Sequence, residues 1–325
     1  MSDSDFFEQN SEPVKYSQVD SLEVNLSSAG KLSAPPTLRV TDYTMEDTAK
    51  LASANGNNII KLLIEVLQAR IQEDFDVRLL HENEFEEILF SIYVNFWNTA
   101  FLDYPFPWKE EDLVGMTEAE ADKIRSGEKK LKVNIDLTQV QVDEISEDFK
   151  EPIIISQGEK KVGLRLPRVG DLLLADEKTK EKFAVQDKRF SDLRFLMNQG
   201  GSLDSIKDKE KERLGPFIEH EKERGMYFFS LKNALLIQFV EENGVKRALT
   251  TMEEKYHEYK KMPRKLWNAF LDATEKIKFG VNHDVKVVSP ITNEIVTRRC
   301  LFQVLDYIPS DELSDSSGYS VQFGD

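Results

Sequence analysis

The sequence LRVTDYTMEDTAKL at residues 38–51 is followed by two strongly apolar segments, IIKLLIEVLQARI at residues 59–71 and FEEILFSIYVNF at residues 85–96. Apolar residues alternate with a polar one in residues 38–40, which predicts a short strand. Both apolar segments repeat hydrophobic residues at three- and four-residue steps, which predicts two helices with one buried face each. Because the link over residues 73–80 is short, we expect these helices to form an antiparallel pair and the nucleus of the core.

The rest of the chain carries weaker patterns of both kinds. Alternating hydrophobicity predicts strands over residues 131–137, 152–156 and 162–166. Helical periodicity over residues 228–239 and 263–280 predicts helices that end at glycines, and alternation from residue 285 onward predicts a terminal hairpin. We therefore predict an α+β fold, mainly helical, with a small, mostly antiparallel sheet and a C-terminal β-hairpin.

Composition divides the chain into five regions. The ends are polar and acidic, which is typical of disordered tails. Mixed charge dominates the middle, which is typical of solvated helices, and Gly200-Gly201 and Gly215-Pro216 are expected to separate those helices. The predicted regions are a disordered tail at 1–36, an α+β core domain at 37–177, a charged helical region at 178–280, a β-hairpin at 281–309 and a disordered tail at 310–325.

The charge balance excludes some partners. The 325 residues include 43 Lys+Arg and 59 Asp+Glu, a formal net charge of -16. A phosphate backbone would be repelled, so we expect no nucleic-acid partner. We expect no membrane span, because no segment approaches the ~20 uninterrupted apolar residues that cross a bilayer. The acidic start MSDSDFFE is unlike a secretory signal, and a single cysteine fits a reducing cytoplasm.

The histidines do not match a metal-binding spacing. His81, His220 and His257 are each followed by glutamate, but the zinc-protease pattern needs a second histidine four residues later. Those later positions are Phe, Arg and Lys, so the three histidines are interpreted as unpaired surface residues. We therefore expect no metal site.

Other catalytic patterns are also missing from the sequence. Gly30-Lys31 is the one Gly-Lys pair, and it lacks the glycine and hydroxyl residue of a phosphate loop. Cys300 lies in a predicted strand beside two arginines, and we interpret it as a small buried hydrophobic residue rather than a nucleophile. We predict no catalytic residues, no cofactor and no enzyme activity, and hence a structural or assembly protein.

Aromatic residues are the candidates for partner binding. Two lie next to each other in the N-terminal tail and suggest a docking peptide. The others lie in the aromatic string after the second apolar segment, where they form either part of the core or an exposed docking patch. The candidate partner-binding residues are Phe6, Phe7, Trp97, Phe101, Phe106 and Trp108.

The order of these features resembles the baseplate proteins of T-even-type tailed bacteriophages, the group with a hub subunit or hub assembly factor. The resemblance spans roughly residues 38–308. It rests on LRVTDYTMED at 38–47, FDVRLL at 75–80, VGLRLPRVGD at 162–171, the helix at 263–280 and the hairpin sequence VKVVSPITNE at 285–294.

The resemblance implies a role in the virion tail baseplate, or in its assembly in the host cytoplasm, through contacts with other phage tail or baseplate proteins. Members of this group often carry cysteine pairs in the terminal hairpin, which resembles a zinc ribbon. Here those positions read Ser289-Pro290-Ile291-Thr292, and one thiol cannot make a four-ligand zinc site. We therefore expect packing of Val285, Val287, Ile295 and Phe302 to hold the hairpin.

Two alternatives stay open at this point. The protein is a transient tail assembly chaperone that is absent from the mature virion, or it is a cytoplasmic enzyme or regulator with a site assembled from scattered residues. A polar pocket that contains His257, Glu258 and Arg264 would favour the enzyme.

Overall fold

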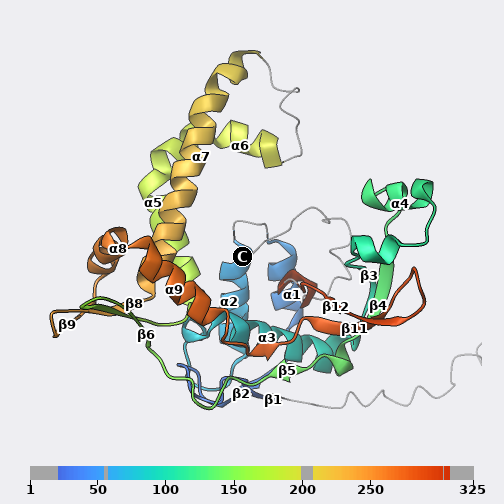
Figure 1. Ribbon diagram of the computed structural model, residues 1–325, viewed down its shortest axis with the longest axis horizontal. Coiled ribbons are helices and arrows are strands. Elements are labelled where there is room, and N and C mark those ends of the chain that lie inside the picture. The colour runs from blue at the N-terminus through green and yellow to red at the C-terminus, as the bar shows by residue number, and fades with distance from the viewer. Residues whose placement is uncertain (1–20, 55–57, 199–207, 303, 308–325) are drawn as a thin grey trace, which may run out of the picture.

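The computed structural model describes residues 21–54, 58–198, 208–302 and 304–307 (Figure 1). It has an α+β fold that is mainly helical, with small antiparallel sheets and a C-terminal hairpin, which confirms the predicted fold class. The helices are α1 (Met45–Ala52), α2 (Ile59–Arg70), α3 (Glu82–Ile92), α4 (Glu118–Arg125), α5 (Val169–Arg189), α6 (Ser191–Asn198), α7 (Asp208–Leu235), α8 (Met252–Lys261) and α9 (Arg264–Thr274). The strands are β1 (Leu22–Asn25), β2 (Thr37–Val40), β3 (Ala100–Pro105), β4 (Lys132–Asp136), β5 (Val142–Asp143), β6 (Ile153–Gln157), β7 (Lys160–Leu164), β8 (Ile237–Glu242), β9 (Val245–Ala248), β10 (Gly280–Val281), β11 (Asp284–Val288) and β12 (Ile295–Arg299).

The largest core forms around α2 and α3, whose predicted apolar faces are buried. Leu63, Leu67 and Ile88 are among its fully buried side chains. The two helices are steeply inclined to each other in Figure 1 and do not form the expected antiparallel pair. Directly after α2, Ile71 forms an antiparallel β-bridge with Val40 of β2.

The predicted N-terminal tail is partly ordered, so the boundary at residue 36 is wrong. Strand β1 pairs antiparallel with β2, and Val24, Leu26 and Ala34 are buried in the main core. These hydrophobic residues are too widely spaced to form a local pattern, and only packing in the main core buries them. Residues 1–20 and the tail at 310–325 lie outside the described residues.

The C-terminal hairpin belongs to the same core. Val285, Val287 and Phe302 are buried there, as predicted. Ile295 is 74% exposed, so its expected packing role is wrong. It pairs with Val288 across the hairpin, and both point to the outer face because side chains alternate along a strand.

A second core forms where α8 and α9 pack on one face of the four-stranded sheet β6-β7-β8-β9. We expected one helical stripe to reach Phe239, but α7 ends at Leu235 and Phe239 lies in β8. Phe239 of β8 pairs with Gly163 of β7, and its ring covers the glycine. Only glycine fits there, because a Cβ would lie 2.1 Å from the ring. Asn243-Gly244, with positive φ at both residues, turns β8 back into β9.

Helices α5, α6 and α7 form an arm that projects from the rest of the protein (Figure 1). The predicted boundary at 177/178 lies inside α5, and α7 runs through Gly215-Pro216, so neither is a break. Packing against α5 continues past the proline, since Phe217 is buried against Phe190, with ring centroids 5.8 Å apart. This packing outweighs the local preference of glycine and proline to end a helix.

Candidate functional site

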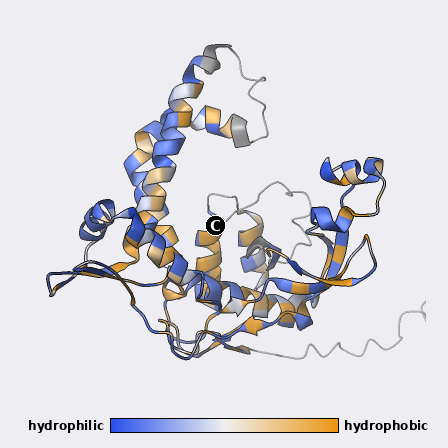
Figure 2. Ribbon diagram, viewed as in Figure 1, coloured by the Kyte–Doolittle hydropathy of each residue, from blue (hydrophilic) through white to orange (hydrophobic). Residues whose placement is uncertain are grey.

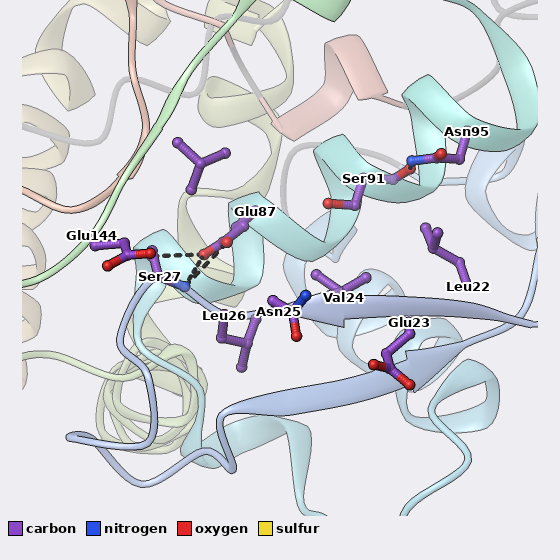
Figure 3. Close-up of a pocket in the computed structure, with 11 residues that line it drawn as sticks. Leu22, Glu23, Val24, Asn25, Leu26, Ser27, Glu87, Ser91, Asn95 and Glu144 are labelled. Carbon is purple, nitrogen blue, oxygen red and sulfur yellow. Dashed lines mark hydrogen bonds between the residues drawn. The ribbon is translucent and has the colours of Figure 1, made fainter.

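Two glutamates on α3, Glu84 and Glu87, are buried beneath the N-terminal segment, which we define as residues 21–36. The Ser27 hydroxyl donates to Glu87 Oε2 at 2.7 Å, and the Ser27 backbone N–H lies 3.1 Å from both oxygens (Figure 3). The Ser28 hydroxyl donates to Glu84, whose other oxygen accepts the His81 backbone N–H at 2.8 Å. Both carboxyl groups therefore bind the segment that precedes them by about sixty residues in the chain.

Burial shifts the protonation of these groups. It raises the pKa of both Glu84 and Glu87, although the serine hydrogen bonds favour the charged forms. Burial, with help from the Arg168 charge, lowers the pKa of His81 to about 3, so its ring is neutral. Glu84 is fully buried, so no substrate reaches it. We interpret this cluster as the attachment of the N-terminal segment to α3, not as an acid–base site.

A pocket of about 260 Å³ lies beside Glu87 (Figure 3). Glu23, Glu87 and Glu144 line it, and no described lining residue is basic. Its buried carboxylate, Glu87, is already bonded to Ser27, so we assign no ligand to this pocket.

A second polar cluster lies within the arm. His220 Nε2 is 2.9 Å from Asp187 Oδ1 and 3.8 Å from Glu221 Oε1, a ligand set that metals use. Arg194 bonds both carboxylates, at 2.9 Å and 2.5 Å, and Arg224 lies 3.3 Å from Asp187. The two guanidinium groups already neutralise the carboxylates that would otherwise bind a metal cation. The cluster therefore acts as an ion-pair network that joins α6 to α5 and α7.

The terminal hairpin has no counterpart of the zinc-binding cysteines that members of the resembled group often carry. Ser289 is fully buried at the turn, and its hydroxyl oxygen accepts the backbone N–H groups of Ile291 and Thr292 at 3.2 and 3.3 Å. Cys300 lies at the opposite end of the hairpin, beside His283. Burial raises the pKa of the Cys300 thiol to about 11, which keeps it protonated. Serine hydrogen bonds therefore hold this turn.

The structure places the predicted aromatic residues mainly in the core. Phe101 and Phe106 are buried, so of the two alternatives for these residues the core placement holds and the exposed docking patch does not. Trp97 and Trp108 are half-buried against the same core, and Trp97 Nε1 donates to Asp42 at 2.8 Å. Strand β3, which the sequence patterns did not predict, turns Phe101 inward opposite Ile135. Phe6 and Phe7 lie outside the described residues.

The histidines also differ from the expectation. His81 and His220 are buried, and only His257 is exposed as predicted. Glu258, which the enzyme alternative would place in a polar pocket with His257 and Arg264, is ion-paired with Arg247 at 2.6 Å. Its sequence neighbours gave no sign of this partner, which comes from β9. Arg264 is exposed.

The arm carries exposed hydrophobic side chains that the sequence patterns missed. We define the arm stripe as Ile218, Met226 and Phe229 on α7, which are 57%, 53% and 57% exposed. Phe195 on α6 is 61% exposed. Figure 2 shows hydrophobic positions between hydrophilic ones along these helices. These residues stand among many charged ones in the sequence, so composition alone indicated a solvated helix there.

Comparisons with known proteins add no relative. No protein-family model, curated protein or solved structure matches the chain. Among the helices of the described residues, none has the length and apolar character to cross a membrane.

Proposed function

We propose that this protein is a non-catalytic structural or assembly component of a phage tail baseplate, present in the virion or in the host cytoplasm during assembly. It acts by binding other tail or baseplate subunits, and its arm is the contact element. The arm stripe is the observation that carries this proposal. The resemblance to T-even-type baseplate proteins supplies the class of partner.

The geometry of α7 supports a binding role for the stripe. Phe229 follows Ile218 by eleven residues, and at about 100° per residue the two lie within about 20° of each other. Met226 lies about 60° from Phe229 on the same side. Phe217 and His220 face α5 and are buried, so the stripe lies on the side of α7 turned away from α5.

Isolated exposed hydrophobic residues are common on soluble proteins. The arm differs in the kind of residue it exposes. Of the exposed large hydrophobic residues in the described part of the chain, the two phenylalanines, Phe195 and Phe229, both lie on the arm. Exposed aromatic residues are typical of protein–protein interfaces.

The stripe offers a useful binding energy. Each of its side chains is already about half-buried, so full burial against a partner contributes about 1 kcal/mol. Three such residues contribute on the order of 3 kcal/mol, which corresponds to about a hundredfold in affinity.

The genes beside the coding sequence test the class of protein. We expect tail tube, sheath and baseplate genes there, and a neighbourhood without virion genes would contradict the proposal. Mass spectrometry of purified virions then separates a resident subunit from a transient chaperone, which is absent from the particle.

Complementation tests the arm. A phage that lacks this protein is expected to make incomplete baseplates, visible by electron microscopy, and wild-type protein supplied from a plasmid is expected to restore them. The double variant Ile218→Glu, Phe229→Glu is expected to fold but not to restore them. The matched control is Leu102→Glu, Val245→Glu, which changes two exposed hydrophobic residues outside the arm. Equal rescue by both double variants would refute the role of the arm.

A further inference from the structure

A groove of about 650 Å³ lies between α2, the link that follows it and the first turns of α5. Ile64 on α2 lines it but is only 5% exposed, so its open apolar surface comes from Phe75 on the link and Leu173 on α5. Phe75 and Leu173 are half-buried against the main core and keep part of their surface open. The groove thus presents apolar contact area next to a well-packed support.

The walls of the groove are fixed before any partner binds. Gln68 on α2 donates to the Phe75 carbonyl at 2.8 Å and accepts the Val77 N–H at 3.0 Å, which ties the link to α2. Gly170 lets the start of α5 approach the link closely, since a Cβ there would lie 2.7 Å from the Arg78 carbonyl oxygen. Binding therefore requires little ordering of the groove, which favours affinity.

The rim of the groove is negative. Four carboxylates line it, against the two cations Lys61 and Arg78. Arg78 is engaged by Asp76 at 2.8 Å, and Lys61 lies 4.0 Å from Glu65. The other two carboxylates, Asp74 and Glu177, are not within ion-pair distance of either cation, and Glu177 interacts with the Arg78 charge at longer range. An occupant with positive charge beside an apolar side chain matches this surface.

Charge also decides between possible occupants. Residues 308–325 of this chain contain four acidic residues and no lysine or arginine, and residues 1–20 contain five acidic residues and one lysine. Both ends would be repelled by the rim. A second copy, with a net charge of -16, is disfavoured in the same way. The occupant is therefore a different protein.

We propose that this groove binds an amphipathic segment of a partner protein, in which one large hydrophobic side chain is flanked by lysine or arginine. The hydrophobic side chain packs against Phe75 and Leu173, and the flanking cations reach Asp74 and Glu177. This inference rests on the proposed function in protein assembly and names the chemistry of one partner.

Fluorescence anisotropy with the full chain tests the proposal. The probe is a labelled 14-residue synthetic peptide of leucine and lysine at helical spacing. Two matched peptides replace every lysine by glutamate or every leucine by serine. We expect the leucine–lysine peptide to bind at least tenfold more tightly than either, and its affinity to fall with added salt. Equal affinity for the serine peptide would overturn the role of the apolar surface.

Charge variants locate the binding to the groove. Asp74→Asn with Glu177→Gln is expected to weaken binding about five- to tenfold, since two charge contacts are lost. The control Glu128→Gln with Asp148→Asn makes the same change in net charge at exposed residues outside the groove, and it is expected to leave affinity unchanged. Equal weakening by both pairs would show a diffuse attraction and overturn the proposal, and so would no weakening by either.

The outcomes separate this inference from the proposed function. The arm variant Ile218→Glu, Phe229→Glu is expected to bind the peptide normally, because the stripe does not line the groove. If the protein binds all three peptides equally but the arm variant still fails to restore baseplates, the groove proposal is refuted and the arm proposal stands. Selective peptide binding by a protein whose gene lies among unrelated genes refutes the baseplate role alone.

Discussion

Removing the hydroxyl of Ser27 tests how the N-terminal segment is held on α3. The hydroxyl donates to the buried Glu87 carboxylate at 2.7 Å, and Ser27 itself is 3% exposed. A hydrogen bond to a charged group contributes about 1.5–3 kcal/mol, and a neutral one about 0.5–1.5 kcal/mol. At pH 7.5 we expect Ser27→Ala to lower the free energy of unfolding by about 2 kcal/mol.

The cost depends on pH because burial raises the pKa of Glu87 above its ordinary value of 4.5. The folded protein therefore binds this proton more tightly than the unfolded chain does. The stability that Glu87 contributes is full below pH 4.5 and declines as the pH rises through the folded pKa. At pH 4 the carboxyl group is protonated, and the Ser27 hydrogen bond is a neutral one. The cost of Ser27→Ala should then fall to about 1 kcal/mol.

Urea unfolding followed by tryptophan fluorescence measures both values. Trp97 and Trp108 pack against the main core, whereas Trp267 belongs to the second core, so a Trp267→Phe background restricts the signal to the relevant region. Thr138→Ala is the control, since its hydroxyl donates to an exposed carboxylate, that of Asp136. Hydrogen bonds from Thr138 lower the pKa of Asp136, so this control should cost the same at both pH values. An equal cost of Ser27→Ala at pH 4 and pH 7.5 would refute the reasoning.

Three further predictions concern the sheet, the hairpin and the cysteine. Gly163→Ala should lower the free energy of unfolding by about 1–3 kcal/mol, measured by urea unfolding, because its Cβ would overlap the Phe239 ring. Burial lowers the pKa of His283, but the Glu86 carboxylate, 3.3 Å away, outweighs it and the pKa is raised, so the stability from His283 protonation is full below pH 6.5 and declines as the pH rises through the folded pKa. NMR titration should show this raised pKa, and Glu86→Gln should lower it. Cys300, buried with its pKa raised to about 11, should react with a thiol reagent at pH 8 far more slowly in the folded protein than in urea.

Each of these has a direct control. Gly158→Ala adds a Cβ in open space at a turn with φ +60°, so it tests backbone strain without a clash. A loss equal to that of Gly163→Ala would contradict the steric argument. A His283 pKa that does not change in Glu86→Gln would remove the carboxylate as its cause. Rapid labelling of Cys300 in the folded protein would show that the hairpin opens.

Local periodicity by itself determined the helices and strands whose burial depends on near neighbours in the chain. The apolar faces of α2 and α3 and the alternation in β4 and β11 are of this kind, because residues three, four or two positions apart share a face in any context. The Asn243-Gly244 hairpin turn belongs to the same class, because an Asn-Gly pair takes up positive φ at both residues from its own local chemistry.

Contacts between distant segments determined the rest. Ser27 and Glu87 are sixty residues apart, and no spacing in the chain indicates that one buries the other. The pairing of β3 with β4 turned Phe101 inward, and packing on α5 carried α7 past Pro216. The groove is likewise assembled from α2, the link and α5, with Leu173 far from Ile64 in sequence. Burial of a side chain depends on which distant segments pack against it, and only the tertiary structure specifies those segments.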